Sequence, residues 1–98
     1  MKETTERIVQ VIRSIKKGTV ASYGEIASLA GLQNGARQVA RILHSMSGTQ
    51  DLPWWRVVKA GDCIALPKGG GFEEQQALLE REGWTISEAG KLLRNTSQ

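Results

Sequence analysis

The sequence has few of the residues that bind metals or form crosslinks. Among its 98 residues there are one cysteine, Cys63, and one histidine, His44. A single cysteine excludes an intrachain disulfide and a cysteine-rich zinc cluster, and one histidine adds too few ligands for a metal site. We therefore expect no metal and no cofactor. We also expect a reducing compartment, the cytoplasm, with nucleoid association in a bacterium.

Long apolar runs are also missing. No stretch approaches the roughly 20 residues that cross a bilayer, and the polar segment 1–7 lacks the apolar core of a secretion signal. Hydrophobic residues make up 40% of the chain and charged residues 23%, which is typical of a folded protein with one domain over 1–98. The net charge of +3 suits a polyanionic partner without requiring one.

Apolar periodicity and capping residues predict the first two helices. Apolar residues at helical spacing from Ile8 onward predict a helix over 5–17, with Lys16 and Lys17 in its last turn. A second helix should begin at Ser22, which has capping-box spacing to Glu25.

A third helix follows after a short glycine-containing link at 31–33. Asn34 is a suitable N-cap for it, and the pattern runs to about Ser45. On a helical wheel its apolar residues share one side, and the opposite side carries Arg37, Arg41 and His44. Two helices joined in this way are typical of a helix-turn-helix.

The C-terminal half predicts a wing and a last helix. Strand patterns at 56–60 and 63–66 flank the turn Gly61-Asp62, and a helix is predicted over 73–82. The segment 84–86 should be extended, and the tail from Arg94 should be loose. The predicted fold class is α+β, a small winged helix-turn-helix-like domain with four main helices and a short β-hairpin wing.

Five motifs resemble the DNA-binding domain of the O6-alkylguanine-DNA alkyltransferase family, over residues 5–84. In order, they are Tyr23-Gly24-Glu25-Ile26-Ala27, Arg37-Gln38-Val39-Ala40, Pro53-Trp54-Trp55-Arg56-Val57, Gly70-Gly71 and Leu78-Leu79-Glu80-Arg81-Glu82-Gly83. Each motif alone is a weak signal, but their order and spacing together are specific.

The repair motif of that family, Pro-Cys-His-Arg-Val, is changed at both of its reactive positions. Trp54 replaces the acceptor cysteine, and Trp55 replaces the histidine that activates the cysteine through water. Met46 stands where the family has an asparagine, and only Glu82 remains at the position of the relay glutamate. Tryptophan at the acceptor position marks the alkyltransferase-like proteins, so the chain resembles that branch of the family.

The chemistry of the two replacements points the same way. Alkyl transfer needs a thiolate, and a thiol needs a neighbouring base to form one. An indole is not a usable alkyl acceptor at neutral pH, whereas its flat ring can stack on a base. We therefore expect no catalytic residue and no enzymatic activity.

The resemblance implies a protein that flips an O6-alkylated guanine out of double-stranded DNA, holds it without dealkylation and flags it for nucleotide excision repair. Its partners would be damaged DNA and damage-recognition proteins of that pathway, and it would act as a monomer away from membranes. The implied DNA contacts are Tyr23, Asn34, Gly35, Arg37, Gln38 and Arg41. The implied alkylguanine pocket is formed by Tyr23, Trp54, Arg56, Val57, Gly69 and Gly70.

Some of these residues have two interpretations. Arg37, at the family's finger position, would fill the gap left by the flipped base, although an isolated arginine on a helix is usually only solvated. His44, on the same face, would contact phosphate or remain solvated. If 54–55 is a strand, its two tryptophans point to opposite faces, so Trp54 lines the pocket while Trp55 packs or covers.

Two further interpretations concern the rim of the pocket. The loop 68–71 would direct a backbone N–H at the O6 atom, or would simply be a flexible turn. Arg56 would lie beside the pocket, or would pair with an acid such as Glu82 or Asp51.

Two rival functions stay open. The first is a methyltransferase that uses Cys63, although no histidine lies near it in sequence and its alternation with Ile64 and Leu66 is typical of a strand residue. The second is a winged-helix transcription regulator that reads the base edges of undamaged DNA, usually as a dimer.

Overall fold

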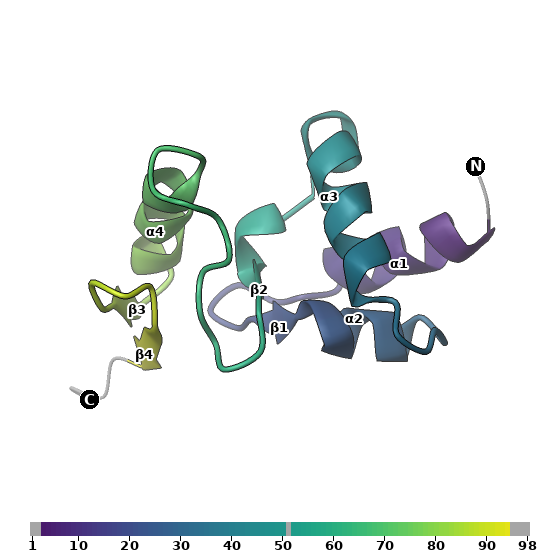
Figure 1. Ribbon diagram of the computed structural model, residues 1–98, viewed down its shortest axis with the longest axis horizontal. Coiled ribbons are helices and arrows are strands. Elements are labelled where there is room, and N and C mark those ends of the chain that lie inside the picture. Colours follow the sequence, from purple (N-terminus) through teal and green to yellow (C-terminus); the bar gives the residue numbers. More distant parts are fainter. Residues whose placement is uncertain (1–2, 51, 95–98) are drawn as a thin grey trace.

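The computed structural model describes residues 3–50 and 52–94, with side chains over 3–45 and 52–93. No helix in these residues is long and apolar enough to cross a membrane. The elements follow the order α1 (Glu3–Arg13), β1 (Ala21–Ser22), α2 (Tyr23–Leu29), α3 (Ala36–Gln50), the 3₁₀ turn η1 (Trp54–Arg56), β2 (Val57–Val58), α4 (Phe72–Arg81), β3 (Trp84–Ile86) and β4 (Leu92–Arg94). The α+β class with four main helices is confirmed (Figure 1).

Helix α1 is shorter at its C-terminal end than its apolar spacing predicts. Its buried side includes Ile8 and Ile12, but the helix ends at Arg13, so Lys16 and Lys17 lie in the following turn. The hydroxyl of Ser14 donates to the carbonyl of Val11 at 2.6 Å. A serine that bonds to a nearby carbonyl competes with the helical ladder, which explains the early end.

Helix α2 begins as predicted from its capping box. The Ser22 hydroxyl accepts the N–H of Glu25 at 3.1 Å, and the Glu25 carboxylate accepts the N–H of Ser22 at 2.8 Å. These two bonds satisfy donors that the first helical turn leaves free. Tyr23, the first residue of α2, is thereby fixed at the beginning of a rigid element.

Helix α3 begins one residue later than predicted, at Ala36. Asn34 has a left-handed backbone, with φ of 55°, and it is the Gly35 carbonyl that accepts the first helical bond, from Val39 at 3.0 Å. The prediction of Asn34 as N-cap was therefore wrong. Helix α3 continues to Gln50, beyond the end predicted near Ser45, and residue 51 lies outside the described residues.

The predicted wing is largely replaced by other pairings. Residues 54–56 form η1, and β2 pairs in parallel with β1, placing Ala21 beside Val57. The turn at 61–62 exists, but among the described residues only the bridge between Lys59 and Cys63 spans it.

The C-terminal segment supplies the missing partners of the predicted hairpin. The N–H of Ile64 donates to Gly90 at 2.9 Å, and the N–H of Leu92 donates to Asp62 at 2.8 Å. Strand β4 also pairs antiparallel with β3, so Arg94 opposes Trp84 and is not part of a loose tail. Residues 95–98, the rest of that tail, lie outside the described residues.

The described residues form two hydrophobic cores. In Figure 1, α1, α2 and α3 lie on one side of β2, and α4 with β3 and β4 lies on the other. The first core joins α1, α2 and α3, and the second joins α4 to the C-terminal strands. Gln75 of α4 is 2% exposed, and its Nε2 donates to the carbonyls of Trp55 and Val57 at 3.0 Å each. These bonds attach the η1–β2 segment to α4.

Candidate functional site

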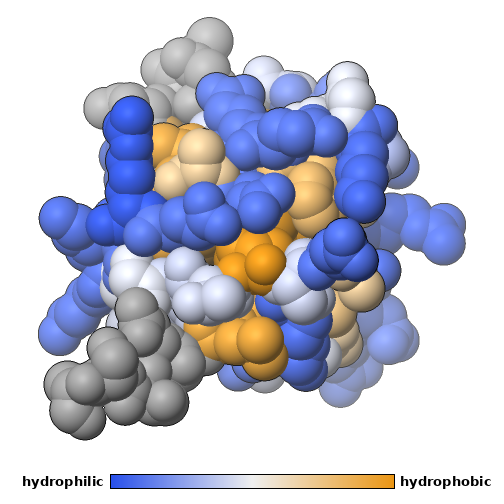
Figure 2. All heavy atoms as spheres, turned by 90° about the vertical axis from the view of Figure 1, so that its left-hand side faces the viewer, coloured by the Kyte–Doolittle hydropathy of each residue, from blue (hydrophilic) through white to orange (hydrophobic). Residues whose placement is uncertain are grey.

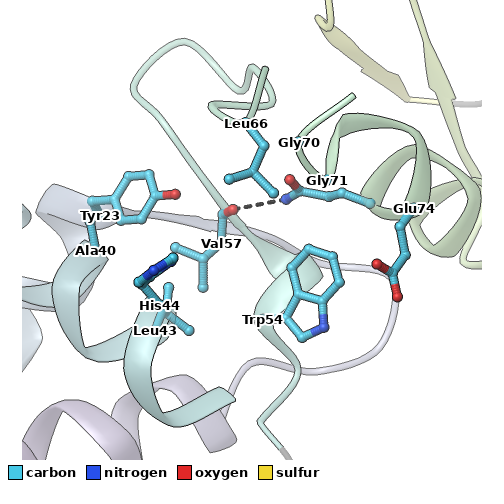
Figure 3. Close-up of a pocket in the computed structure, with 11 residues that line it drawn as sticks. Tyr23, Ala40, Leu43, His44, Trp54, Val57, Leu66, Gly70, Gly71 and Glu74 are labelled. Atoms are coloured by element: carbon cyan, nitrogen blue, oxygen red, sulfur yellow. Dashed lines mark hydrogen bonds between the residues drawn. The ribbon is translucent and has the colours of Figure 1, made fainter. Parts of the chain in front are cut away.

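A cavity of about 370 Å³ lies between the two cores (Figure 3). Small-molecule sites are typically roughly 300–1,000 Å³, so this cavity can hold a ligand of that kind. Helices α2, α3 and α4, the η1–β2 segment and the loop before α4 all contribute to its wall. The lining residues are Tyr23, Ala40, Leu43, His44, Trp54, Val57, Leu66, Gly70, Gly71, Glu74 and Gln75.

The cavity brings together four of the six residues assigned to the alkylguanine pocket from the sequence. They are Tyr23, Trp54, Val57 and Gly70. Arg56 and Gly69 do not line it, because both are engaged in bonds described below. Burial raises the pKa of the Tyr23 phenol above its ordinary value of 10.0, so its hydroxyl stays protonated and able to donate a hydrogen bond.

Trp54 and Trp55 take different roles, as predicted, but not because they belong to a strand. They lie in η1, with their ring centroids 6.2 Å apart and their planes at 89°. Trp54 lines the cavity, whereas Trp55 packs on the second core. Edge-to-face contacts of this kind stabilise a defined ring orientation, so Trp55 supports the indole of Trp54.

Arg56 forms a structural ion pair with Glu82, one of the two acids proposed as partners from the sequence. Its Nη2 lies 2.7 Å from Oε2, and the two side chains are only 15% and 6% exposed. Arg56 Nη1 also donates to the Ile15 carbonyl at 2.8 Å, and the guanidinium lies 5.2 Å from the Trp55 ring centroid. The arginine therefore connects α4, η1 and the segment after α1.

Both oxygens of the Glu82 carboxylate accept hydrogen bonds from neighbouring residues of the fold. Oε2 accepts the Trp55 indole N–H at 2.9 Å, and Oε1 accepts the Gly18 N–H at 3.2 Å, in addition to the Arg56 bonds. Burial alone would raise the pKa of Glu82, but the hydrogen bonds from Arg56, Trp55 and Gly18 hold the pKa below its ordinary value. The group is therefore a bound carboxylate, and it does not line the cavity.

The loop before α4 has most of its amides occupied. The Gly69 N–H donates to the Glu73 carboxylate at 3.0 Å, and the Gly70 N–H donates to the Pro67 carbonyl at 2.9 Å. Among the described residues, no partner is recorded for the N–H of Gly71, which also lines the cavity. Gly71, with φ of 112° and no side chain, is thus the residue of this loop best placed to donate to a ligand.

Five of the six residues assigned to DNA contact lie along α3 and the turn before it, and the sixth, Tyr23, begins α2. Arg37, Gln38 and Arg41 are exposed, as is Asn34. Gly35 is buried, and a Cβ there would lie 2.9 Å from the Cβ of Leu32, so its role is close packing of the turn.

His44 is a cavity residue that was not assigned to the pocket from the sequence. It is exposed, as its grouping with Arg37 and Arg41 predicts, and it also lines the cavity with Ala40 and Leu43 (Figure 3). Helical spacing places residues 40 and 44 side by side, but nothing in the sequence places that part of the helix at a pocket. Glu74 and Gln75 were also missed, since nothing in the sequence alone places the first turn of the last helix beside residue 54.

Cys63, the nucleophile of the rival enzymatic interpretation, lies elsewhere. It is half-buried beyond the 61–62 turn, its thiol donates to the Gly61 carbonyl at 3.6 Å, and it does not line the cavity. Within residues 3–50 and 52–94, no group of three or more histidine, cysteine, aspartate or glutamate side chains could hold a metal ion.

Comparison with known proteins identifies the family of this chain. The model of the DNA-binding domain of 6-O-methylguanine DNA methyltransferase matches residues 3–84. The chain belongs to this family. A DNA base-flipping protein of Vibrio parahaemolyticus is 42% identical over 88% of this chain and 85% of its own length. Alkyltransferase-like protein 1 of Schizosaccharomyces pombe is 31% identical over 88% of this chain and 81% of its own length.

Solved structures of the family share the fold. The S. pombe protein in complex with damaged DNA containing O6-carboxymethylguanine has a TM-score of 0.80 and 28% identity, over 97% of this chain and 91% of that one. Mycobacterium tuberculosis OGT in complex with DNA has a TM-score of 0.67 and 29% identity, over 84% of this chain but 49% of that one. The chain thus spans about nine tenths of the smaller relative and about half of the larger one.

Proposed function

We propose that this protein binds double-stranded DNA containing O6-alkylguanine and holds the flipped base in the cavity without removing its alkyl group. The observation that carries the proposal is the position of Trp54. Its indole lines a base-sized cavity at the position where the family's repair motif has the acceptor cysteine. Relatives named for base flipping, and a relative solved with an O6-alkylated duplex, support this interpretation.

The chemistry of the cavity wall favours binding over transfer. The described residues that line it include no thiol, and indole does not accept an alkyl group at neutral pH. Trp55 cannot replace the activating histidine, because an indole N–H only donates hydrogen bonds. The wall instead offers an indole for stacking and the N–H of Gly71 for a polar contact with the base.

The exposed side of α3 supports a DNA-binding role beside the cavity. Arg37 and Arg41 are exposed on the helix whose other residues, Ala40 and His44, line the cavity. Base flipping costs a few kcal/mol, and an arginine entering the stack would offset part of that cost. Arg37 takes this part in our proposal, and Tyr23, at the edge of the cavity, helps to rotate the nucleotide.

Other parts of the proposal depend on the resemblance alone. They are that the protein acts as a monomer in the cytoplasm, and that the persistent complex passes the lesion to nucleotide excision repair. Stable binding without chemistry is the property that such a handover needs.

A titration with matched duplexes tests the proposal. Wild-type protein should bind a duplex with O6-methylguanine more tightly than the same duplex with guanine, and protein mass should be unchanged after incubation. Trp54→Ala should lose roughly 1–3 kcal/mol of binding to the damaged duplex, the value of base–aromatic stacking, whereas Trp54→Phe should retain most of it.

Three results would contradict the proposal. Equal affinity for both duplexes would remove damage recognition. A preference among undamaged sequences that ignores alkylation would favour a transcription regulator. An added methyl group on Cys63, found by mass spectrometry, would favour the methyltransferase.

A further inference from the structure

The cavity wall carries one acidic side chain, Glu74, whose charge nothing else in the wall neutralises. Among the described lining residues there is no lysine or arginine, and the other titratable groups are Tyr23 and His44. The Glu74 carboxylate is exposed, and no hydrogen bond or ion pair is recorded for it within the described residues. Its neighbour Glu73 is different, because that carboxylate is bonded to the Gly69 N–H.

Glu74 is one of the acidic residues at the beginning of α4. It lies in the first turn of α4, where the helix dipole favours negative charge. In Figure 3, Glu74 lies on the Trp54 side of the cavity, and Tyr23 and His44 lie on the opposite side. A base held against Trp54 would therefore lie on the same side of the cavity as this carboxylate.

Binding to DNA strengthens the effect of this charge. When a duplex covers the mouth of the cavity, water is displaced from between Glu74 and the flipped base. Coulomb interactions increase as the local dielectric falls, and salt screens buried charges less than exposed ones. The sign of the substituent at O6 then contributes to affinity.

We propose that Glu74 is a charge-selective residue of the alkylguanine site, favouring cationic and neutral O6 substituents over anionic ones. The inference rests on the proposed function and adds to it the class of adduct that the site prefers. It differs from stacking by Trp54, because an indole does not distinguish adducts of equal size by the sign of their charge.

Three duplexes with O6 substituents of similar size but different charge test this proposal. They contain O6-(2-aminoethyl)guanine, O6-(2-hydroxyethyl)guanine and O6-carboxymethylguanine, each titrated at one pH and one salt concentration. Wild-type protein should bind the aminoethyl duplex most tightly and the carboxymethyl duplex least tightly. In Glu74→Gln, the ratio of these two affinities should fall by about tenfold, the effect of removing one charge at several ångströms in a partly solvated site.

Glu80→Gln is the matched control. It removes the same charge from the same helix, but Glu80 is exposed and does not line the cavity, and within the described residues its side chain bonds with that of the half-buried Gln76. Its affinity ratio should equal that of the wild type. Because Glu74 has no bond to lose, Glu74→Gln should also unfold in urea at the wild-type concentration.

The failure of this inference is distinguishable from the failure of the proposed function. If the hydroxyethyl duplex binds more tightly than undamaged DNA but the aminoethyl to carboxymethyl ratio is the same in wild type and Glu74→Gln, only the role of Glu74 is overturned. If the ratio changes equally in Glu80→Gln, the effect is one of net charge, and the role of Glu74 is again overturned. If no modified duplex exceeds undamaged DNA, both proposals fall.

Discussion

The indole nitrogen of Trp55 donates a hydrogen bond to Glu82 Oε2 over 2.9 Å. In the family's repair motif a histidine stands at this position, and a histidine can donate with one ring nitrogen while the other accepts a proton. An indole has a donor and no acceptor. Trp55 therefore bonds to the glutamate and offers no proton acceptor beside residue 54.

This difference predicts what is needed to restore alkyl transfer. Trp54→Cys alone should react slowly with an O6-methylguanine duplex, because no base would lie beside the introduced thiol. The double variant Trp54→Cys/Trp55→His should react roughly 10²–10⁴ times faster, the usual contribution of a general base. Single-turnover transfer of a labelled methyl group measures both rates.

The control for this prediction is Trp54→Cys/Trp55→Phe, which frees space without adding a base. It should react no faster than Trp54→Cys. Equal rates for the histidine and phenylalanine variants would show that the missing base is not what limits transfer.

The Arg56–Glu82 pair predicts a large effect on stability. Removing one partner leaves the other charge buried, so Glu82→Gln and Arg56→Met should each lower the free energy of unfolding by about 3–5 kcal/mol. The bonds from Arg56, Trp55 and Gly18 depend on the ionised carboxylate. Urea unfolding at neutral pH measures the loss, and a change below about 1 kcal/mol would contradict a structural role.

The same pair predicts how stability depends on pH. The pKa of Glu82 is lower in the folded protein than its ordinary value of 4.5. The folded state therefore binds the proton less readily than the unfolded state, and the stability that this group contributes is fully present above about pH 4.5 and is lost as the pH falls below it. Wild-type protein should lose stability over that range more steeply than Glu82→Gln, as measured by urea unfolding at several pH values.

Local signals in the sequence predicted the helices well, because capping and apolar spacing are properties of neighbouring residues. The capping box of Ser22 and Glu25 is the clearest example. The hairpin was wrong because strand pairing depends on distant segments. Residues 62–64 have their partners at 90–92, and β2 has its partner in β1, which no periodicity indicated.

For the candidate site, too, the sequence predicted the residues within motifs but not those brought in by the packing of distant segments. Motif spacing placed Tyr23, Trp54, Val57 and Gly70 in one group, and the structure brings these four together around the cavity. It did not predict that Glu74 joins them, since that contact depends on how α4 packs against the η1–β2 segment. The proximity of Glu74 to the cavity could therefore be recognised only from the three-dimensional structure.

Close packing in the helix-turn-helix gives a separate prediction. A Cβ at Gly35 would lie 2.9 Å from the Cβ of Leu32 and 3.1 Å from that of Ala27, so Gly35→Ala should lower the free energy of unfolding by about 1–3 kcal/mol. Gly24→Ala is the control, because there the nearest atom, Ser22 Oγ, lies 4.0 Å away. In helix α2 that change should be neutral or stabilising by up to about 1 kcal/mol. Equal unfolding midpoints for the two variants would contradict the packing argument.

The two arginines of α3 should differ in the way they affect binding. Arg37→Ala should lower affinity for the O6-methylguanine duplex by about 1–3 kcal/mol with little effect on undamaged DNA, because only a flipped base leaves a gap to fill. If Arg41 contacts phosphate, Arg41→Ala should weaken both duplexes alike and reduce the slope of log affinity against log salt by about one. Titrations of both duplexes at several salt concentrations separate the two patterns. If Arg37→Ala behaves like Arg41→Ala, Arg37 is a backbone contact and the stacking role belongs to another residue.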